Sequence, residues 1–130
     1  MNQRGFATLE VILMVVVIGI LASVAVPRFT DVTTKANTAK IQADLTTIDT
    51  AIQMYYMDGK NKEDLNLDKL KADNYLMDVP TPPTGKAFIG KNKEHTISAT
   101  SYQIKNDRAT LDDKTAGDFS TTKTTPTTGD

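Results

Sequence analysis

Apolar residues fill almost the whole segment 6–26, which reads FATLEVILMVVVIGILASVAV and has Glu10 as its one ionisable residue. This run is longer than the roughly 18 apolar residues expected of a membrane-spanning helix. Within lipid, every backbone N–H and C=O must find its partner inside the segment, which favours a helix. The valines at 15–17 do not change this, because β-branching lowers helix propensity only slightly. The pattern therefore predicts a transmembrane helix near the N-terminus.

After Pro27 the pattern becomes a single apolar stripe. Its members are spaced by four, three, four and three residues, and they are Ile41, Leu45, Ile48, Ile52 and Tyr55. This spacing is typical of one face of an amphipathic helix that packs on a core. Pro27 lacks an N–H and is expected to bend or weaken the helix locally. Asp58-Gly59 predicts the end of the helix, because glycine accepts the left-handed conformation of a helix cap.

Short elements and turns make up the rest of the pattern. We expect a short helix from Leu67 to Asp73 with Asn66 as its N-cap. The segment 78–85 contains three prolines and predicts irregular structure. Strands are predicted from their apolar and alternating residues at 87–89, 95–105 and 109–111. The predicted fold is therefore α+β, with the second half of a long helix packed on a small antiparallel β-sheet.

These patterns divide the 130 residues into four parts. They are a short polar segment at 1–5, the apolar helix at 6–27, a head at 28–115 that includes the second half of the long helix, and a tail at 116–130. The tail is rich in threonine, and from Ser120 onward it contains no apolar residue. Because such a composition buries too little apolar surface to fold, we expect a disordered tail.

Glu10 is the unusual residue of the apolar run. A carboxylate within a membrane helix costs on the order of 2.5–3.5 kcal/mol on insertion scales. One interpretation is that Glu10 lies near the interface and reaches water. The other is that it pairs with a cation, because a cut after Gly5 would free a positively charged α-amine on Phe6, four residues earlier. The two charges could then cancel either within one chain or between neighbouring chains. Cleavage as an ordinary secretory signal, near residues 22–25, is a weaker alternative, since such signals have apolar cores of roughly 7–15 residues.

The segment Gly5-Phe6-Ala7-Thr8-Leu9-Glu10, followed by the apolar run, resembles the class III signal of type IV pilins and type II secretion pseudopilins. The resemblance implies that a prepilin peptidase cuts after Gly5 and methylates the amine of Phe6, and that Glu10 sets subunit register during filament assembly. The commonest family pattern is Gly-Phe-Thr-Leu-Ile-Glu, so this chain differs between the phenylalanine and the glutamate but keeps their spacing. Gly19 and Pro27 fall where the family has its helix-weakening glycine and proline.

A second similarity lies in the head. The end of the long helix, Tyr55-Tyr56-Met57-Asp58-Gly59, is similar to that of major pseudopilins. So is the later run that contains Tyr75-Leu76, Val79-Pro80, Pro82 and Gly85. The head therefore resembles that of a major pseudopilin.

Composition and charge exclude several classes of function. The formal net charge of −1 gives no indication of a nucleic-acid surface, and without cysteine there is no disulfide or thiolate metal site. His95 is the only histidine and has no arranged serine or cysteine nucleophile, so we interpret it as a surface residue. Phosphate-binding and hydrolase motifs are absent. The sequence predicts neither an enzyme nor an organic cofactor.

Calcium is the one cofactor that the sequence suggests. Four acidic residues follow the predicted strands and could gather at the sheet edge: Asp107, Asp112, Asp113 and Asp118. Carboxylate oxygens suit calcium, and the resemblance adds that major pseudopilins often bind calcium near their C-terminal strands. The spacing of an EF-hand is absent, however, and the alternative is a set of solvated acidic turn residues.

The resemblance implies a structural subunit of a type IV pilus-like filament, of the type II secretion pseudopilus kind, with a pilus or a competence filament of the same architecture as close alternatives. Implied partners are further copies of the chain in a helical filament, membrane lipid, the prepilin peptidase, the inner-membrane assembly platform and minor pilins. Nucleic acid is expected only for a competence filament.

The implied location is the bacterial cytoplasmic membrane, crossed once with the N-terminus inside and the head extracytoplasmic. The positive charges alone do not favour this orientation, since Arg4 precedes the span whereas Arg28, Lys35 and Lys40 follow it. The competing function is a membrane-anchored extracytoplasmic binding module that does not polymerise. Such a module would need neither a cut at Gly5-Phe6 nor Glu10.

Overall fold

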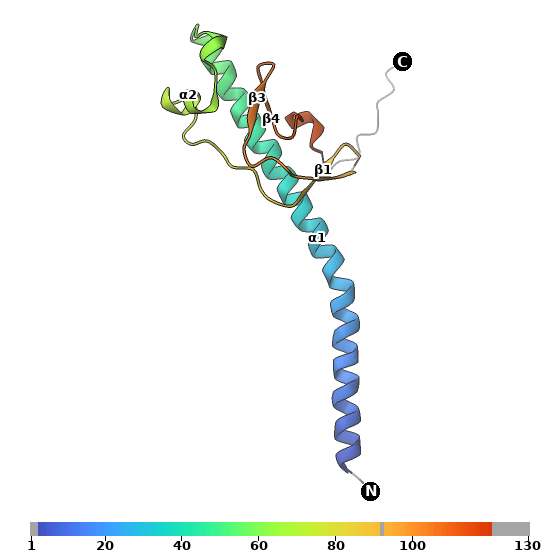
Figure 1. The fold of residues 1–130 in the computed structure, drawn as a ribbon. Helices are drawn as coiled ribbons and strands as arrows, with labels where there is room; N and C mark the ends of the chain where they lie inside the picture. The colour runs from blue at the N-terminus through green and yellow to red at the C-terminus, as the bar shows by residue number, and fades with distance from the viewer. Residues whose placement is uncertain (1–2, 92, 121–130) are drawn as a thin grey trace, which may run out of the picture. The chain divides into compact units, whose positions relative to one another are not determined.

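The computed structural model describes residues 3–91 and 93–120. The chain divides into two compact units, Met1–Thr33 and Thr34–Asp130. Its elements, in chain order, are α1 (Gln3–Met57), the short 3-10 helix η1 (Lys62–Asp64), α2 (Leu67–Ala72), β1 (Lys86–Ile89), β2 (Lys93–Thr96), β3 (Gln103–Lys105), β4 (Arg108–Thr110) and the short 3-10 helix η2 (Ala116–Asp118). A long N-terminal helix followed by antiparallel strands confirms the predicted α+β class (Figure 1).

Within the first unit, α1 presents its apolar side chains outward on all sides. Every large apolar side chain from Phe6 to Val24 is more than half exposed. The few hydroxyl groups bond back to the helix itself, as Thr8 Oγ1 does to the carbonyl oxygen of Arg4 at 3.0 Å and Ser23 Oγ to that of Ile20 at 2.7 Å. These bonds satisfy polar groups locally and leave the outer surface apolar.

Within the second unit, which we call the head, the apolar stripe of α1 is the centre of the core. All five stripe residues are at most 2% exposed, so their predicted role in core packing is confirmed. They pack with Leu70, Leu76, Ala87, Tyr102, Ala109, Leu111 and Phe119. The core of the head is thus one helix face covered by the segments that follow it.

Two polar side chains of α1 hold β1 in place. Thr38 is buried, and its Oγ1 donates to the carbonyl oxygen of Thr34 and accepts from the amide of Phe88, each at 2.7 Å. Asn37 Nδ2 donates to the carbonyl oxygens of Thr84 and Lys86, at 3.1 and 3.0 Å. The first strand is therefore attached to α1 through its backbone.

The end of α1 and the start of α2 lie where the sequence predicts them. α1 ends at Met57, and Gly59 has a φ of 76°, the left-handed conformation expected there. α2 begins at Leu67, and the side chain of Asn66 accepts from the amide of Lys69 at 2.7 Å. The predicted N-cap is therefore confirmed, although α2 ends one residue earlier than expected, at Ala72.

The strands form two hairpins and not one three-stranded sheet. β1 pairs with β2 and β3 pairs with β4, both antiparallel. The predicted single strand 95–105 is wrong, because the chain leaves β2 after Thr96 and pairs again only from Gln103. The cause is Asp112, whose carboxylate accepts from the amides of Ser98 at 3.0 Å and Ala99 at 2.8 Å and so turns the chain away from the strand.

The head extends beyond the predicted boundary at residue 115. Ala116–Asp118 form η2, Phe119 is fully buried, and it pairs with Ile89 in an isolated antiparallel bridge. Residues 116–119 therefore belong to the folded head, because buried Phe119 anchors them to its core, a signal that the polar composition of the tail obscured. The part of the predicted tail at 121–130 lies outside the described residues.

Candidate functional site

The uncovered part of α1 is the candidate functional surface. It consists of thirteen large apolar side chains between 51% and 69% exposed: Phe6, Leu9, Val11, Ile12, Leu13, Met14, Val15, Val16, Val17, Ile18, Ile20, Leu21 and Val24. We call this set the apolar helix surface. Exposed apolar surface of this extent indicates contact with another protein or with a membrane.

Length and composition allow α1 to cross a bilayer. Among the described residues, one helix, Arg4–Met57, is long and apolar enough to cross a membrane. Its most apolar window of 18 residues has a mean hydropathy of 2.8, and none of that window is buried. In a soluble protein an equally apolar helix would be the most buried element, so the lack of cover points to lipid or to further subunits.

Glu10 interrupts the apolar helix surface with one carboxylate. It shares a side of the helix with Leu13, Met14, Val17 and Ile18. Its carboxylate has neither a hydrogen bond nor an ion pair among residues 3–91 and 93–120. An unpaired carboxylate beside aliphatic side chains is costly in lipid, so this geometry suits pairing with a cation.

The other positions expected to act in processing and assembly also lie in α1. Gly5 and Phe6 form its first turns, and Gly19 and Pro27 lie further along it. A Cβ built on Gly5 or on Gly19 would meet nothing within 4 Å. These glycines are thus not required by packing within the chain, and the roles assigned to all four residues stay predictions.

The predicted calcium ligands are distributed over separate contacts. Asp107 accepts from Tyr56 and from Lys62, each at 2.7 Å, and Asp113 pairs with Lys105. Asp118 accepts from the amide and hydroxyl of Thr115, at 2.8 and 3.1 Å. Within the described chain, no group of three or more His, Asp or Glu side chains is arranged to hold a metal ion. Calcium binding stays a prediction that this arrangement does not support.

Asp112, the fourth of these residues, joins β2 to the turn that follows β4. Its side chain is 10% exposed and accepts four hydrogen bonds, from His95 Nε2 at 3.0 Å, from the amides of Ser98 and Ala99, and from Ser98 Oγ at 2.7 Å. Burial by itself would raise the pKa of Asp112, but the hydrogen bonds from Ser98, His95 and Ala99 outweigh it and lower the pKa to about 2. His95 is therefore a structural partner of Asp112, which sequence reasoning missed.

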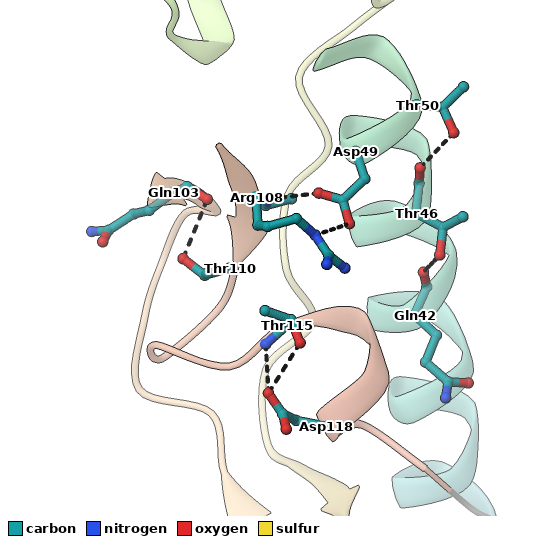
Figure 2. A network of polar contacts seen from close by, with 10 residues as sticks. Gln42, Thr46, Asp49, Thr50, Gln103, Arg108, Thr110, Thr115 and Asp118 are labelled. Atoms are coloured by element: carbon teal, nitrogen blue, oxygen red, sulfur yellow. Dashed lines mark hydrogen bonds and ion pairs between the residues drawn. The ribbon is translucent and has the colours of Figure 1, made fainter. Parts of the chain in front are cut away.

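Two acidic residues beside the core stripe connect α1 to the second hairpin. Figure 2 shows Asp49, whose carboxylate accepts from the amide of Ala109 at 2.7 Å and from Arg108 Nε at 3.2 Å. Asp44 accepts from the hydroxyl of Tyr102 at 2.6 Å, and burial together with this hydrogen bond raises the pKa of Tyr102 far above its usual value. Sequence reasoning assigned no role to either residue. Their position next to the stripe residues Leu45 and Ile48 was the only signal.

The C-terminal part of the head is joined to α1 in the same way. Gln42 Nε2 donates to the carbonyl oxygen of Phe119, and Ser120 donates its amide to Phe88 at 3.2 Å. Figure 2 shows Gln42 on α1 together with Thr115 and Asp118, which form the capping box of η2. The polar contacts of the head thus have a structural role, which leaves the apolar helix surface as the feature without a function inside the chain.

Comparison with known proteins relates this chain to filament components. It is 33% identical over 90 residues to the type II secretion system core protein G of Escherichia coli, an alignment that covers 69% of this chain and 59% of the relative. It is 30% identical over 103 residues to the core protein G of Pectobacterium carotovorum, covering 67% and 65%. It is 37% identical over 60 residues to the type IV narrow pilus major component of Thermus thermophilus, covering 46% and 52%.

The chain therefore aligns with less than two thirds of the length of each of these relatives. No family model matches the chain, and no solved structure matches it.

Proposed function

Since the chain belongs to the type IV pilin and pseudopilin family, we propose that it is a structural subunit of a filament of the type II secretion pseudopilus kind. The alignments with core protein G support this kind, because they are 33% and 30% identical over 90 and 103 residues, whereas the 110-residue alignment with a type IV major fimbrial protein is 26% identical. The proposal gives the chain a structural role and no catalytic one.

The observation that carries the proposal is the apolar helix surface. Removing one such side chain from water contributes about 1.5–3 kcal/mol, and nothing within the described chain covers thirteen of them. Lipid covers this surface while the subunit is stored in the membrane. Once the subunit leaves the bilayer, the helices of neighbouring copies take the place of lipid. Storage in a membrane followed by helix packing accounts for an apolar surface that a soluble head does not need.

Processing at Gly5 adds the cation that Glu10 lacks. A prepilin peptidase cuts between Gly5 and Phe6 and methylates the new amine, which is a cation four residues before Glu10. In a low-dielectric environment, pairing with that amine offsets the cost of burying the carboxylate. Pairing between the amine of one copy and Glu10 of the next fixes their register. Gly19 and Pro27 weaken the helix so that it can leave the bilayer.

The subunit is inserted in the bacterial cytoplasmic membrane with its N-terminus inside and its head outside. Its partners are membrane lipid, the peptidase, the inner-membrane assembly platform, minor pilins and further copies of itself. This topology places the cleavage site on the cytoplasmic side and the head where a filament grows.

The first test is the intact mass and the N-terminal residue of the chain extracted from the membranes of its own host. We expect a chain that begins at N-methylated Phe6. A chain that still begins at Met1 would instead support an anchored module that does not polymerise. A chain that begins after Ala25 would indicate a secreted domain and would remove the role of Glu10.

The second test separates membrane insertion from assembly. We expect Glu10→Ala to be inserted and cut normally but to give little filament, measured as the chain recovered in a sheared filament fraction. Asp31→Ala is the matched control, because Asp31 is an exposed acidic residue of α1 that forms no ion pair in the described structure. A normal filament yield from Glu10→Ala would overturn the pairing of charges.

A further inference from the structure

One end of the head carries acidic side chains without partners. Glu63 and Asp64 lie in η1, directly after the end of α1, and both are exposed. Their carboxylates form no hydrogen bond or ion pair with any described residue. The neighbouring cation Lys62 is neutralised by Asp107 at 2.7 Å. We call Glu63 and Asp64 the acidic turn.

A second region of the head carries cations without partners. Residues at the end of β1, at the start of β2, after β4 and in η2 surround an open hollow of about 390 Å³. Its lining residues are Ile89, Gly90, Lys93, Asp113, Lys114, Gly117 and Asp118. Neither Lys93 nor Lys114 forms an ion pair in the described part of the chain. We call this the basic hollow.

The two carboxylates in the basic hollow do not neutralise its lysines. Asp113 is already paired with Lys105. Asp118 accepts from the uncharged amide and hydroxyl of Thr115 and keeps its own charge. Together with Lys105, the two lysines of the lining still outnumber its two carboxylates by one positive charge. The glycines at 90 and 117 bring no side chain of their own, so the hollow has room for a side chain from outside. The ligand it fits is a carboxylate that approaches Lys93 and Lys114.

The acidic turn and the basic hollow of one chain are far apart. The amide of Phe88 in β1 bonds to Thr38 of α1, whereas the acidic turn follows Met57. Thr38 and Met57 are nineteen residues apart on this helix, which corresponds to about 28 Å at 1.5 Å per residue. Figure 1 shows the same separation within the head, with α2 beside the C-terminal end of α1 and β1 well before that end. Neither Glu63 nor Asp64 lines the hollow of its own chain, and neither forms an ion pair with Lys93 or Lys114 there, so we look for their carboxylates in another molecule.

We propose that the basic hollow of one copy receives the acidic turn of a second copy. The inference rests on the proposed function and adds to it the contact between heads. Complementary charges steer association and fix the register of an interface. Two different surfaces allow a head-to-tail arrangement of copies, and heterologous contacts of this kind generate open helical assemblies when the rotation does not close. One repeated contact of this type suits a filament.

Cysteine crosslinking tests the contact directly, since the chain contains no cysteine of its own. Full-length chains with Asp64→Cys and with Lys93→Cys are produced together in the same cells and treated with a short thiol crosslinker. We expect a crosslinked dimer that contains one chain of each kind. The matched control pairs Asp64→Cys with Lys71→Cys, another exposed lysine, which lies in α2 and contacts none of the residues that line the hollow. This control should give no dimer above background.

Charge reversal tests whether the complementarity matters. Glu63→Lys with Asp64→Lys should lower the filament yield by at least about tenfold, since opposing like charges cost several kcal/mol. Lys93→Glu with Lys114→Glu should lower it equally. The chain that carries all four substitutions regains complementary surfaces and should recover most of the yield. A recovery of this kind distinguishes a contact between copies from damage to the fold.

The outcomes separate this inference from the proposed function. Filament formation, together with the specific crosslink and the recovered yield of the fourfold variant, would support both the contact between heads and the filament role. Filaments without the crosslink, or without any effect of charge reversal, would overturn the contact between heads and leave the filament role intact. The specific crosslink without filaments would support the contact and overturn the filament role. Neither filaments nor the crosslink would overturn both.

Discussion

The two halves of α1 use similar aliphatic side chains in opposite ways. In the first unit, Val11 and Ile18 are 59% and 65% exposed, whereas in the head Ile41 and Ile48 are fully buried. The first half is apolar on all sides, so no face is distinguished from the others. The second half confines its large apolar residues to one stripe and has polar residues beside it. A stripe on one face fixes which side of a helix packs on the core of its own chain. A helix that is apolar on all sides has no such preferred side, so its packing depends on what surrounds it.

The acidic residues of the two regions differ in whether they have hydrogen-bond partners within the chain. In the head, Asp49 and Asp112 are largely buried and accept hydrogen bonds from backbone amides. In the first unit, Glu10 has no partner within the described structure. These two acidic residues are therefore satisfied within the head, whereas the first unit leaves Glu10 and its apolar side chains without partners among the described residues.

The largest expected difference between the regions is at two phenylalanines. Phe119→Ala should lower the free energy of unfolding of the head by about 3–5 kcal/mol, because it leaves a cavity in the core. Phe29→Ala, at a residue of the first unit that is 70% exposed, should change it by less than about 0.5 kcal/mol. The measurement is chemical denaturation of the full chain in detergent.

Tyrosine fluorescence reports on the head alone in this experiment, because all four tyrosines lie there and tryptophan is absent. Equal destabilisation by the two phenylalanine variants would contradict the division of the chain into a self-sufficient head and an uncovered helix.

The pH dependence of Asp112 gives the next largest effect. Its pKa of about 2 in the folded chain lies below the ordinary value of 3.8, so its contribution to stability is fully present above about pH 4 and is lost as the pH falls through 2. The difference corresponds to roughly 2 kcal/mol. Wild type and Asp112→Asn should therefore differ most in unfolding free energy above pH 4 and converge toward pH 2. Parallel curves would show that the hydrogen bonds from Ser98, His95 and Ala99 do not govern this carboxyl.

A smaller effect is expected at Asp49. Asp49→Ala leaves the amide of buried Ala109 without its acceptor, which should cost about 1.5 kcal/mol of head stability. Asp31→Ala in the first unit removes an equally charged residue that has no ion pair among the described residues, and it should leave the melting temperature of the head unchanged. Melting followed by near-ultraviolet circular dichroism distinguishes the two variants, and a shift at Asp31 as large as that at Asp49 would argue against this account.

The smallest effect separates two glycines. A Cβ at Gly59 or at Gly19 would meet nothing within 4 Å, but only Gly59 has a positive φ. Gly59→Ala should destabilise the head by about 1 kcal/mol, since the left-handed conformation disfavours a side chain. Gly19→Ala should leave head stability unchanged while strengthening the helix. Urea titration of both variants checks this, and an unaffected Gly59→Ala would show that the helix end tolerates another cap.

The elements predicted with most success are those whose residues are close in the sequence. The stripe on α1, its end at Gly59 and the cap at Asn66 were all correct, because helix periodicity and capping depend on residues within four positions of one another. The strand at 95–105 was wrong for the opposite reason. The strand is interrupted by Asp112, which lies thirteen residues beyond its partner Ala99. The alternation of apolar and polar residues within a strand carries no information about so distant a partner.

The amino-acid sequence by itself determined the uncovered apolar helix, its single carboxylate and the amphipathic second half of α1, since each is a matter of residue type and local spacing. Only the tertiary structure decided that Phe119 closes the core, that Asp44 and Asp49 hold the second hairpin, and that the candidate calcium ligands are engaged elsewhere. It also decided that the acidic turn and the basic hollow lie too far apart to meet within one head. Contacts between residues 50 or more positions apart depend on how the chain folds back on α1, and a pattern read along the chain does not contain that geometry.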